Sequence, residues 1–261
     1  MASVRIGIIG AGHLAGYLLE GFHKRGPGAP VRIADARPGQ AEQLAQRWGA
    51  QAVEGNQAVV DGSDLVILAV RPQDALPALA ALSFRPEQVV ASAAAGVALA
   101  VLAPAAAPAG AVRIMPISSA ALNRSPTLVH PDHPAVREAF ALLGQVHVLP
   151  DEAAFTAASV LAAFYGWVYA LADQAVAWTA GAGVPPDLAR RIVLETIRST
   201  ADVGLARPDQ PLHELLDQLA TPGGITRHGL AVLRERGALA AWSQALDAVL
   251  EGMGGAGKQK C

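Results

Sequence analysis

The stretch that decides the fold is Val4-Arg5-Ile6-Gly7-Ile8-Ile9, followed directly by Gly10-Ala11-Gly12-His13-Leu14-Ala15. Residues 4–9 fit one buried parallel strand, and helical spacing of apolar residues begins near Leu14. A Gly-x-Gly-x-x-Ala turn between a strand and a helix leaves the backbone bare, so that a pyrophosphate can approach it closely. The free N–H groups at the start of the helix then face that negative charge. The stretch predicts a dinucleotide site, and a glycine turn without a ligand is the alternative.

An acidic residue follows at the distance that such a site requires. Asp35 ends the strand-like run 31–34 and lies about 25 residues after Gly10, close to the expected spacing. A carboxylate at this place typically binds the ribose 2′-OH of NAD, whereas a nearby arginine accommodates the 2′-phosphate of NADP. Arg37 supplies such an arginine, so the sequence leaves NAD and NADP both open. Arg37 as a solvated loop charge is the alternative.

The composition limits the classes of protein to which this chain can belong. Its 261 residues are 52% hydrophobic and 16% charged, which suits one large or two smaller domains with a sizeable core. A formal net charge of −2 argues against a nucleic-acid partner, because such binding depends on neutralised phosphates. The single cysteine, Cys261, excludes an internal disulfide and fits a reducing, cytoplasmic location. The histidines include no His-x-His or His-x-x-x-His pair, so we expect no metal site.

Up to about residue 150, short apolar runs alternate with helical stretches. The expected strands are 4–9, 31–34, 51–53, 64–70, 88–93, 111–115 and 145–149. The expected helices are 14–25, 38–48, 56–61, 73–81 and 134–143. This alternation is typical of βαβ units in a parallel sheet covered on both faces. It predicts an α/β, doubly wound, Rossmann-like domain over residues 1–150, with the ligand at the carboxyl ends of the strands.

After Pro150 the strand signal stops. Helices are expected at 152–182, 186–204, 211–219 and 225–250, which gives an all-helical domain over 151–252 and a flexible tail over 253–261. The first of these helices is apolar nearly all round and therefore needs partners on every side. We expect a homodimer or a larger homo-oligomer built on these helices. A membrane span over 153–172 is the alternative.

Further candidates follow the other strands. Arg71, held by Pro72 after the run 64–70, would lie beside the phosphates or ribose of a cofactor, or is a surface arginine that caps the next helix. Asn56 could reach the nucleotide or serve as a helix N-cap. Small residues around Ala95 would let a flat nicotinamide ring approach the backbone, and Ser118 offers a hydroxyl or is a turn residue. The expected cofactor-binding set is Gly10, Ala11, Gly12, His13, Leu14, Ala15, Asp35, Arg37, Asn56, Ala69, Val70, Arg71, Pro72 and Ala95.

A glycine-rich loop stands out in the helical half. Thr221-Pro222-Gly223-Gly224-Ile225-Thr226 exposes backbone N–H groups just ahead of a helix, an arrangement that suits an anion such as a substrate carboxylate. The expected substrate-binding residues are Thr221, Gly223, Gly224 and Thr226. An ordinary loop is the alternative.

Taken together, these segments resemble the pyrroline-5-carboxylate reductase family over nearly the whole chain. The resemblance runs from the Gly10–Ala15 turn through 68–73, 92–96, 113–116 and 183–185 to the Pro-Gly-Gly-x-Thr loop at 222–226, which is the most specific motif. It implies a C-terminal domain like that of 6-phosphogluconate dehydrogenase, an interleaved dimer, and reduction of a cyclic imine by NAD(P)H to give proline.

Two segments depart from the family pattern. Ile117-Ser118-Ser119 stands where Asn-Thr-Pro is usual, and Leu161-Ala162-Ala163-Phe164-Tyr165-Gly166-Trp167 stands where the family has Ser-Gly-Ser-Gly-Pro-Ala-Tyr. In the family, the second stretch lines the substrate pocket with small and hydroxyl groups. A pocket that loses such hydrogen-bonding partners loses discrimination for a small polar substrate. The exchange indicates a substrate other than pyrroline-5-carboxylate, or a lost one.

We therefore expect hydride transfer to a C=N bond, with proton delivery to the imine nitrogen as the step that needs a side chain or a bound water. The candidate catalytic residues are Thr226, Tyr165 and Ser118. A β-hydroxyacid-type dehydrogenase is one alternative, but it would need a lysine in the long helix, and the lysines stand only at 24, 258 and 260. A non-catalytic dinucleotide-binding sensor is the other alternative.

Overall fold

The computed structural model of the chain describes residues 4–26, 28 and 30–255. Contacts divide these residues into two compact units. The first contains the residues up to Val160 together with those from Leu250 onward, and the second is Leu161–Val249. The predicted boundary near residue 150 stays a prediction, because this grouping keeps residues 151–160 with the first unit. Cys261 and residues 256–261 of the expected tail lie outside the described residues, whereas residues 253–255 end a helix.

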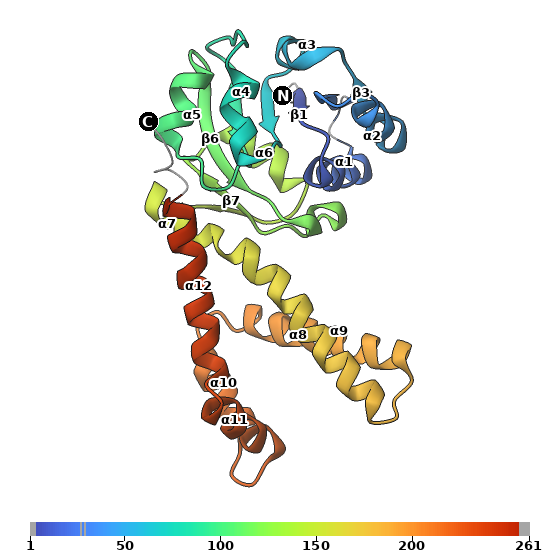
Figure 1. Cartoon of the computed structure of the whole chain (residues 1–261), viewed down its shortest axis with the longest axis vertical. Helices are drawn as coiled ribbons and strands as arrows, with labels where there is room; N and C mark the ends of the chain where they lie inside the picture. The colour runs from blue at the N-terminus through green and yellow to red at the C-terminus, as the bar shows by residue number, and fades with distance from the viewer. Residues whose placement is uncertain (1–3, 27, 29, 256–261) are drawn as a thin grey trace. The chain divides into compact units, whose positions relative to one another are not determined.

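The first unit is built on one eight-stranded sheet (Figure 1). The strand order β3-β2-β1-β4-β5-β6-β7-β8 contains the 3-2-1-4-5-6 order of the doubly wound dinucleotide-binding fold. The strands are β1 (Ile6–Ile9), β2 (Arg32–Ala34), β3 (Gln51–Ala52), β4 (Leu65–Leu68), β5 (Val89–Ser92), β6 (Gly110–Met115), β7 (Thr127–His130) and β8 (Val146–Val148). All seven expected strands are present, and the predicted fold class is confirmed.

Three elements of this unit were not expected from the sequence, namely β7, α5 (Leu99–Ala106) and the short helix η2 (Ser118–Leu122). Strand β7 pairs antiparallel with β6 and parallel with β8, so the sheet is mixed at this end and not parallel throughout. Its sequence, Thr127-Leu128-Val129-His130, has its two apolar residues side by side and so lacks the alternation that identifies a strand. Helix α5 is apolar all round and contains Pro104, so it lacks the polar face that identifies a helix in a sequence.

Helices cover both faces of the sheet because alternate strand residues point to opposite sides. Ile6 and Ile8 of β1 pack in one core cluster with α1 (His13–Arg25), α2 (Gln40–Trp48) and α6 (Pro134–Ala141). Ile9 packs in the other cluster with α3 (Gly55–Asp61), α4 (Ala75–Leu79) and α5. Residues in both clusters are almost fully buried, so the sheet is a rigid support for the loops at its edges.

One glycine permits a close contact that positions the connection between β6 and β7. The short helix η2 (Ser118–Leu122) lies against α1, and a Cβ at Gly21 would overlap the backbone carbonyl of Ala120. Asn123, in a left-handed conformation, donates hydrogen bonds from Nδ2 to the carbonyls of Gly21 (2.9 Å) and Leu142 (2.8 Å). Together these contacts hold Ser118 at the carboxyl edge of the sheet.

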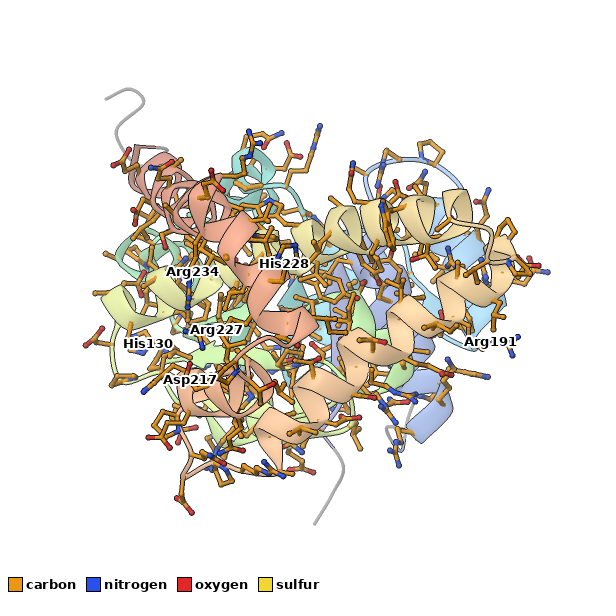
Figure 2. All side chains as sticks on the ribbon, turned by 90° about the horizontal axis from the view of Figure 1, so that it is seen from below. His130, Arg191, Asp217, Arg227, His228 and Arg234 are labelled. Carbon is orange, nitrogen blue, oxygen red and sulfur yellow. The ribbon has the colours of Figure 1, made fainter. Side chains whose placement is uncertain are left out.

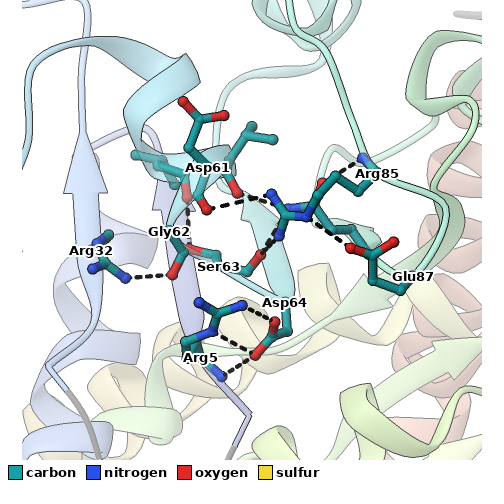
Figure 3. Close-up of polar contacts among 11 residues, drawn as sticks. Arg5, Arg32, Asp61, Gly62, Ser63, Asp64, Arg85 and Glu87 are labelled. Carbon is teal, nitrogen blue, oxygen red and sulfur yellow. Dashed lines mark hydrogen bonds and ion pairs between the residues drawn. The ribbon is translucent and has the colours of Figure 1, made fainter.

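A polar cluster secures the opposite, amino edge of the central strands (Figure 3). Arg5 pairs with Asp64 and thereby ties the start of β1 to the start of β4. Arg32 donates to the carbonyl of Gly62, and Arg85 donates to the carbonyl of Ser63 (3.1 Å). Both carbonyls lie in the turn between α3 and β4, so these hydrogen bonds fix that turn.

Within the described residues, the regular secondary structure of the second unit is entirely helical. Helix α7 (Glu152–Ser159) precedes it in the first unit, and the unit itself is formed by α8 (Leu161–Gly181), α9 (Pro186–Leu205), α10 (Leu212–Leu219), α11 (Ile225–Glu235) and most of α12 (Ala238–Gly255). The predicted helix 225–250 is wrong in one respect, since Gly237 adopts φ +69° and divides it into α11 and α12. Val160 likewise separates α7 from α8 within the predicted helix 152–182.

The second unit buries very little of its apolar surface. Only Ala172 of α8 and Ala189 of α9 are buried, while Trp178 is 76% and Leu205 is 80% exposed. In the described residues, one helical stretch, Glu152–Gly181, is long and apolar enough to cross a membrane. Length and composition alone are weak evidence for a span, because core helices of soluble proteins pass the same test.

We expect Gly21→Ala to destabilise the first unit by about 2 kcal/mol, because its methyl group would overlap a backbone carbonyl that cannot move away freely. Gly16→Ala in the same helix is the matched control. Its methyl group would meet only Leu44 Cδ2, at 3.6 Å, so it should raise the free energy of unfolding by about 0.5 kcal/mol through helix propensity. Urea unfolding of both variants measures the difference, and equal stabilities would contradict the close contact.

Candidate cofactor site

A cleft of about 970 Å³ opens at the carboxyl ends of β1, β2 and β4. These three strands meet where the chain reverses its direction of winding, since β1 lies between β2 and β4. Ligands of doubly wound sheets bind at this switch point. The residues that line the cleft are Ile9, Gly10, Gly12, His13, Leu14, Asp35, Ala36, Arg37, Asn56, Ala69, Val70, Arg71, Asp74, Pro77 and Ala78.

The packing of the protein requires a glycine at position 10, independently of any ligand. It adopts φ +103°, and a Cβ would lie 2.6 Å from the carbonyl oxygen of Ala69 and 2.9 Å from Val70 Cγ1. Its N–H donates to the carbonyl of Ala34 (2.8 Å), while Ala69 N–H donates to Ile9 (2.8 Å). The turn after β1 is therefore held between β2 and β4, and only glycine fits there.

Gly12 is different, because no protein atom lies within 4 Å of the place where its Cβ would be. The missing side chain therefore leaves open space at the wall of the cleft. Gly12 is also the N-cap of α1, where no side-chain hydrogen bond caps the helix. The first N–H groups of α1 lack intrahelical partners, and together with the helix dipole they attract an anion. Both features fit the diphosphate of a dinucleotide.

The carboxylate of Asp35 is almost fully enclosed by donors. Oδ1 accepts from Arg37 N (2.7 Å) and Nε (3.0 Å), and Oδ2 accepts from Ala11 N and Arg37 Nη2 (3.2 Å). A carboxylate has about four lone-pair positions, and these four donors occupy them. Burial raises the pKa of Asp35, but the hydrogen bonds from Arg37 and Ala11 outweigh it, so that the pKa lies below its ordinary value.

Arg37 is held in place by this pair while its side chain stays accessible. The Asp35 side chain is 7% exposed and the Arg37 side chain is 59% exposed, and both residues line the cleft. The guanidinium uses Nε and Nη2 on Asp35 and has further N–H donors on Nη1. The arrangement presents a fixed positive charge at the end of β2, where the adenosine ribose of a dinucleotide lies.

The far rim of the cleft comes from the segments that follow β3 and β4. Arg71 is exposed and pairs with Asp74 (3.0 Å), so it acts partly as a surface ion pair at the start of η1 (Pro72–Asp74). Asn56 lines the cleft from the first turn of α3, whose N-cap is Glu54, so the N-cap alternative for Asn56 is wrong.

The structure thus brings together most of the expected cofactor-binding residues. Ten of the fourteen line the cleft; the others are Ala11, Ala15, Pro72 and Ala95. Ala11 instead donates its N–H to Asp35, and Ala15 lies on the buried face of α1, in the core. Ala95 is exposed in the turn after β5. The roles of all fourteen in binding stay predictions.

Five lining residues were not expected from the sequence: Ile9, Ala36, Asp74, Pro77 and Ala78. Asp74, Pro77 and Ala78 belong to η1 and α4, which follow β4 directly. Their position just after the Arg71-Pro72 pair was the available signal. In the described part of the chain, no group of three or more His, Cys, Asp or Glu side chains could hold a metal ion.

The candidate catalytic residues belong to different parts of the chain. Ser118 begins η2 in the sheet unit, and Tyr165 lies in α8, where its hydroxyl is 3.1 Å from that of Tyr169. Thr226 is exposed in the first turn of α11, after the loop in which Gly223 has φ +76° and Gly224 N–H donates to Thr221 (3.0 Å). The proposed roles of these residues and of Thr221, Gly223 and Gly224 stay predictions.

The fold and the cleft define a dinucleotide-binding protein with a Rossmann-type domain and a helical C-terminal region. Residues 5–96 match the family described as NADP oxidoreductase, coenzyme F420-dependent, and residues 151–253 match the family described as pyrroline-5-carboxylate reductase dimerisation. The chain is 30% identical to the pyrroline-5-carboxylate reductase of Pseudomonas aeruginosa, over 95% of each chain. It belongs to the pyrroline-5-carboxylate reductase family.

Solved structures agree with this assignment. The pyrroline-5-carboxylate reductase of Streptococcus pyogenes superposes with a TM-score of 0.84 at 27% identity, over 96% of this chain and 98% of that one. The Plasmodium falciparum pyrroline carboxylate reductase with NADP bound shares the fold, with a TM-score of 0.83 at 18% identity over 97% and 98% of the two chains. The predicted family, enzyme class and cofactors, NADP or NAD, are confirmed, and the dimerisation match supports homo-oligomerisation.

Gly12→Ala separates ligand binding from folding. We expect stability to change by less than about 1 kcal/mol, because the new methyl group meets no protein atom. The same methyl group projects into the space that the diphosphate needs, so the Kd for NADPH should rise at least about tenfold, or about 1.4 kcal/mol. Calorimetric titration measures the Kd and urea unfolding measures stability. Unchanged affinity would contradict the placement of the diphosphate at this turn.

Proposed function

We propose that this chain reduces a cyclic imine and draws its reducing equivalents from NADPH in preference to NADH. The observation that carries the proposal is the cleft at the β1–β4 switch point, with open space at Gly12 and the uncapped start of α1 at its wall. Membership of the pyrroline-5-carboxylate reductase family supplies the reaction class, namely reduction of a C=N bond.

The preference for NADPH follows from the Asp35–Arg37 pair. NADH would have to offer its ribose 2′-OH to a carboxylate whose acceptor positions are already used by Ala11 and Arg37. NADPH would offer a 2′-phosphate to the exposed side of the Arg37 guanidinium, which makes strong charge-assisted hydrogen bonds to phosphate. Asp35 in this proposal orients Arg37 and the glycine turn and does not bind the ribose.

When bound, the reduced nicotinamide supplies the hydride, and the chain's own residues supply position and a proton. The cleft holds the adenosine and diphosphate end of the cofactor. This fixes the nicotinamide ring relative to the imine carbon that receives the hydride. The imine nitrogen gains a proton as the carbon is reduced, and Thr226, Tyr165 and Ser118 are the candidate donors. Thr226 is the preferred substrate contact, because it follows the glycine loop at 223–224, and Arg227, whose charge suits a carboxylate, adjoins it on α11 (Figure 2).

The segment 161–167 supports a substrate more apolar than pyrroline-5-carboxylate. Phe164 and Trp167 pack on Trp242 of α12, with ring centroids 5.6 and 6.2 Å from it, so part of the bulk serves to join two helices. Tyr165 faces Tyr169 edge-on at 5.5 Å. We propose that the remaining aromatic surface of α8 contacts a cyclic imine with a larger apolar group.

The exposed apolar side chains of α8 and α9 support a homodimer. Leu171 of α8 and Ile192 of α9 are each about half exposed, as are many of their neighbours. An apolar surface of this extent requires a partner in water. We propose that a second copy of the chain covers it, in a soluble cytoplasmic enzyme and not in a membrane.

We expect Arg37→Ala to raise the Kd for NADPH at least about tenfold and to leave the Kd for NADH within about twofold. Asp35→Asn should also weaken the binding of NADPH. Its amide nitrogen cannot accept a hydrogen bond from Arg37, so the guanidinium is no longer held in place. Arg137→Ala is the control, since Arg137 is a half-exposed arginine that pairs with Asp132 away from the cleft. Loss of NADH affinity in Asp35→Asn, with NADPH affinity retained, would instead indicate a ribose-binding carboxylate.

Turnover of NADPH identifies the substrate. With the purified protein, we expect larger cyclic imines with apolar substituents to give a higher kcat/KM than pyrroline-5-carboxylate, by about tenfold or more. Thr226→Val, which keeps the shape and removes the hydroxyl, should lower kcat/KM at least about tenfold for a carboxylated imine. A higher kcat/KM for pyrroline-5-carboxylate than for the larger imines would contradict the proposed change of substrate. NADPH binding without oxidation by any imine would instead indicate a sensor.

A further inference from the structure

A partly buried ion pair, in which the Glu152 side chain is 37% exposed, joins the start of α7 to the middle of the sheet unit. Glu152 Oε1 accepts from Arg113 Nη1 at 2.7 Å, and Arg113, in β6, has a side chain that is 3% exposed. The same guanidinium nitrogen donates to Thr156 Oγ1 (3.1 Å), and the guanidinium lies 4.5 Å from the ring centre of Phe155. Arg113 is therefore held by three contacts with α7.

The carboxylate of Glu152 also reaches a third element. Its Oε1 accepts from the backbone N–H of Leu99 at 3.0 Å, which is the first residue of α5. The N-cap of α5 is Ala98, whose side chain cannot accept a hydrogen bond. Glu152 thus caps α5 from a distance of 53 residues in the sequence and fixes where that helix begins relative to β6.

Stability alone does not account for this pair. Arg113 Nη2 and Glu152 Oε2 are buried and make no hydrogen bond to any described residue. Incompletely satisfied buried ion pairs are often no more stable than apolar side chains of similar volume. The pair therefore adds little to the free energy of unfolding, but its hydrogen bonds fix the positions of α5, α7 and β6 relative to one another. Such a role is typical of groups that set the position of a neighbouring segment.

The segment in question is the turn from Ala93 to Ala98, between β5 and α5. Ala93 N–H donates to Leu68 of β4 (3.0 Å), Val97 N–H donates to Ala94 (3.3 Å), and Gly96 adopts φ +75°. Ala95, at the tip, is exposed. The turn follows the carboxyl end of β5. The neighbouring strand β4 continues into residues 69–71, which line the cleft. The start of the turn is thus held by β4, and its end is held by Glu152.

We propose that Glu152 and Arg113 are positioning residues for reduction of the imine. This inference rests on the proposed function. In this proposal the pair sets the position of the Ala93–Ala98 turn, at which the sequence predicts that the nicotinamide ring approaches the backbone, and leaves the adenosine end in the cleft untouched. Glu152 also lies at the start of the segment that matches the dimerisation family, residues 151–253, and it joins the first helix of that segment, α7, to the turn.

The first experiment compares the two ends of the cofactor. In Glu152→Gln and Glu152→Ala, the Kd for 2′,5′-ADP, which lacks the nicotinamide end, should stay within about twofold of wild type, while the Kd for NADPH should rise about fivefold or more. Asp132→Asn is the control, because it breaks a half-exposed ion pair of the same unit and should change neither. Equal effects on both ligands, or none on either, would overturn the proposal.

The second experiment separates positioning from helix capping. Ala98→Asp gives α5 a local N-cap, so the double variant Glu152→Ala, Ala98→Asp should recover the thermal stability that Glu152→Ala loses. It should not recover kcat, which we expect to stay about tenfold below wild type with the imine that wild type reduces best. Recovery of kcat together with stability would show that Glu152 only caps α5.

The two proposals fail in distinguishable ways. Absence of imine turnover by the wild-type chain would reject the proposed function and leave the ligand-binding comparison to decide the role of Glu152. Imine turnover with an unchanged ratio of NADPH to 2′,5′-ADP affinity in Glu152→Gln would reject the positioning role alone.

Discussion

The close approach of the turn after β1 to the backbone of β4 is the constraint on which the site depends. Gly10 lies so near the carbonyl of Ala69 that no Cβ fits, and its N–H and the N–H of Ala69 tie β1 to both neighbouring strands. This contact fixes where α1 begins, and therefore where its free N–H groups point. The core clusters on both faces keep the sheet rigid, so the geometry of the turn is maintained without help from a ligand.

Two carboxylates organise the loops around this turn in the same manner. Asp35 accepts from the N–H of Ala11 and from Arg37, and Glu152 accepts from the N–H of Leu99 and from Arg113. Each links one backbone amide near the start of a helix to one arginine. The difference lies in exposure, because Arg37 faces the cleft and Arg113 is buried. An exposed arginine is suited to bind an anion, whereas a buried one can only hold its neighbours in position.

Sequence reasoning described the cofactor half well because its determinants are local. The Gly10–Ala15 turn, Asp35 and the Arg71-Pro72 pair each follow a strand directly, and a strand end implies a place in the fold. It missed β7 and α5, since Thr127–His130 does not alternate polar and apolar residues and Leu99–Ala106 has no polar face. It also took the helix over 225–250 as continuous, although Gly237 interrupts it with a left-handed conformation.

The sequence by itself determined the doubly wound sheet, the position of the dinucleotide turn and the family, because these depend on the order of short local patterns. Only the tertiary structure decided what individual side chains do. It joined Glu152 to Leu99 and Arg113, and it used Phe164 and Trp167 to pack on Trp242. It also filled the acceptor positions of Asp35 with Ala11 and Arg37. The physical reason is that a hydrogen bond or ring contact depends on distances of a few ångströms between segments that the fold alone brings together.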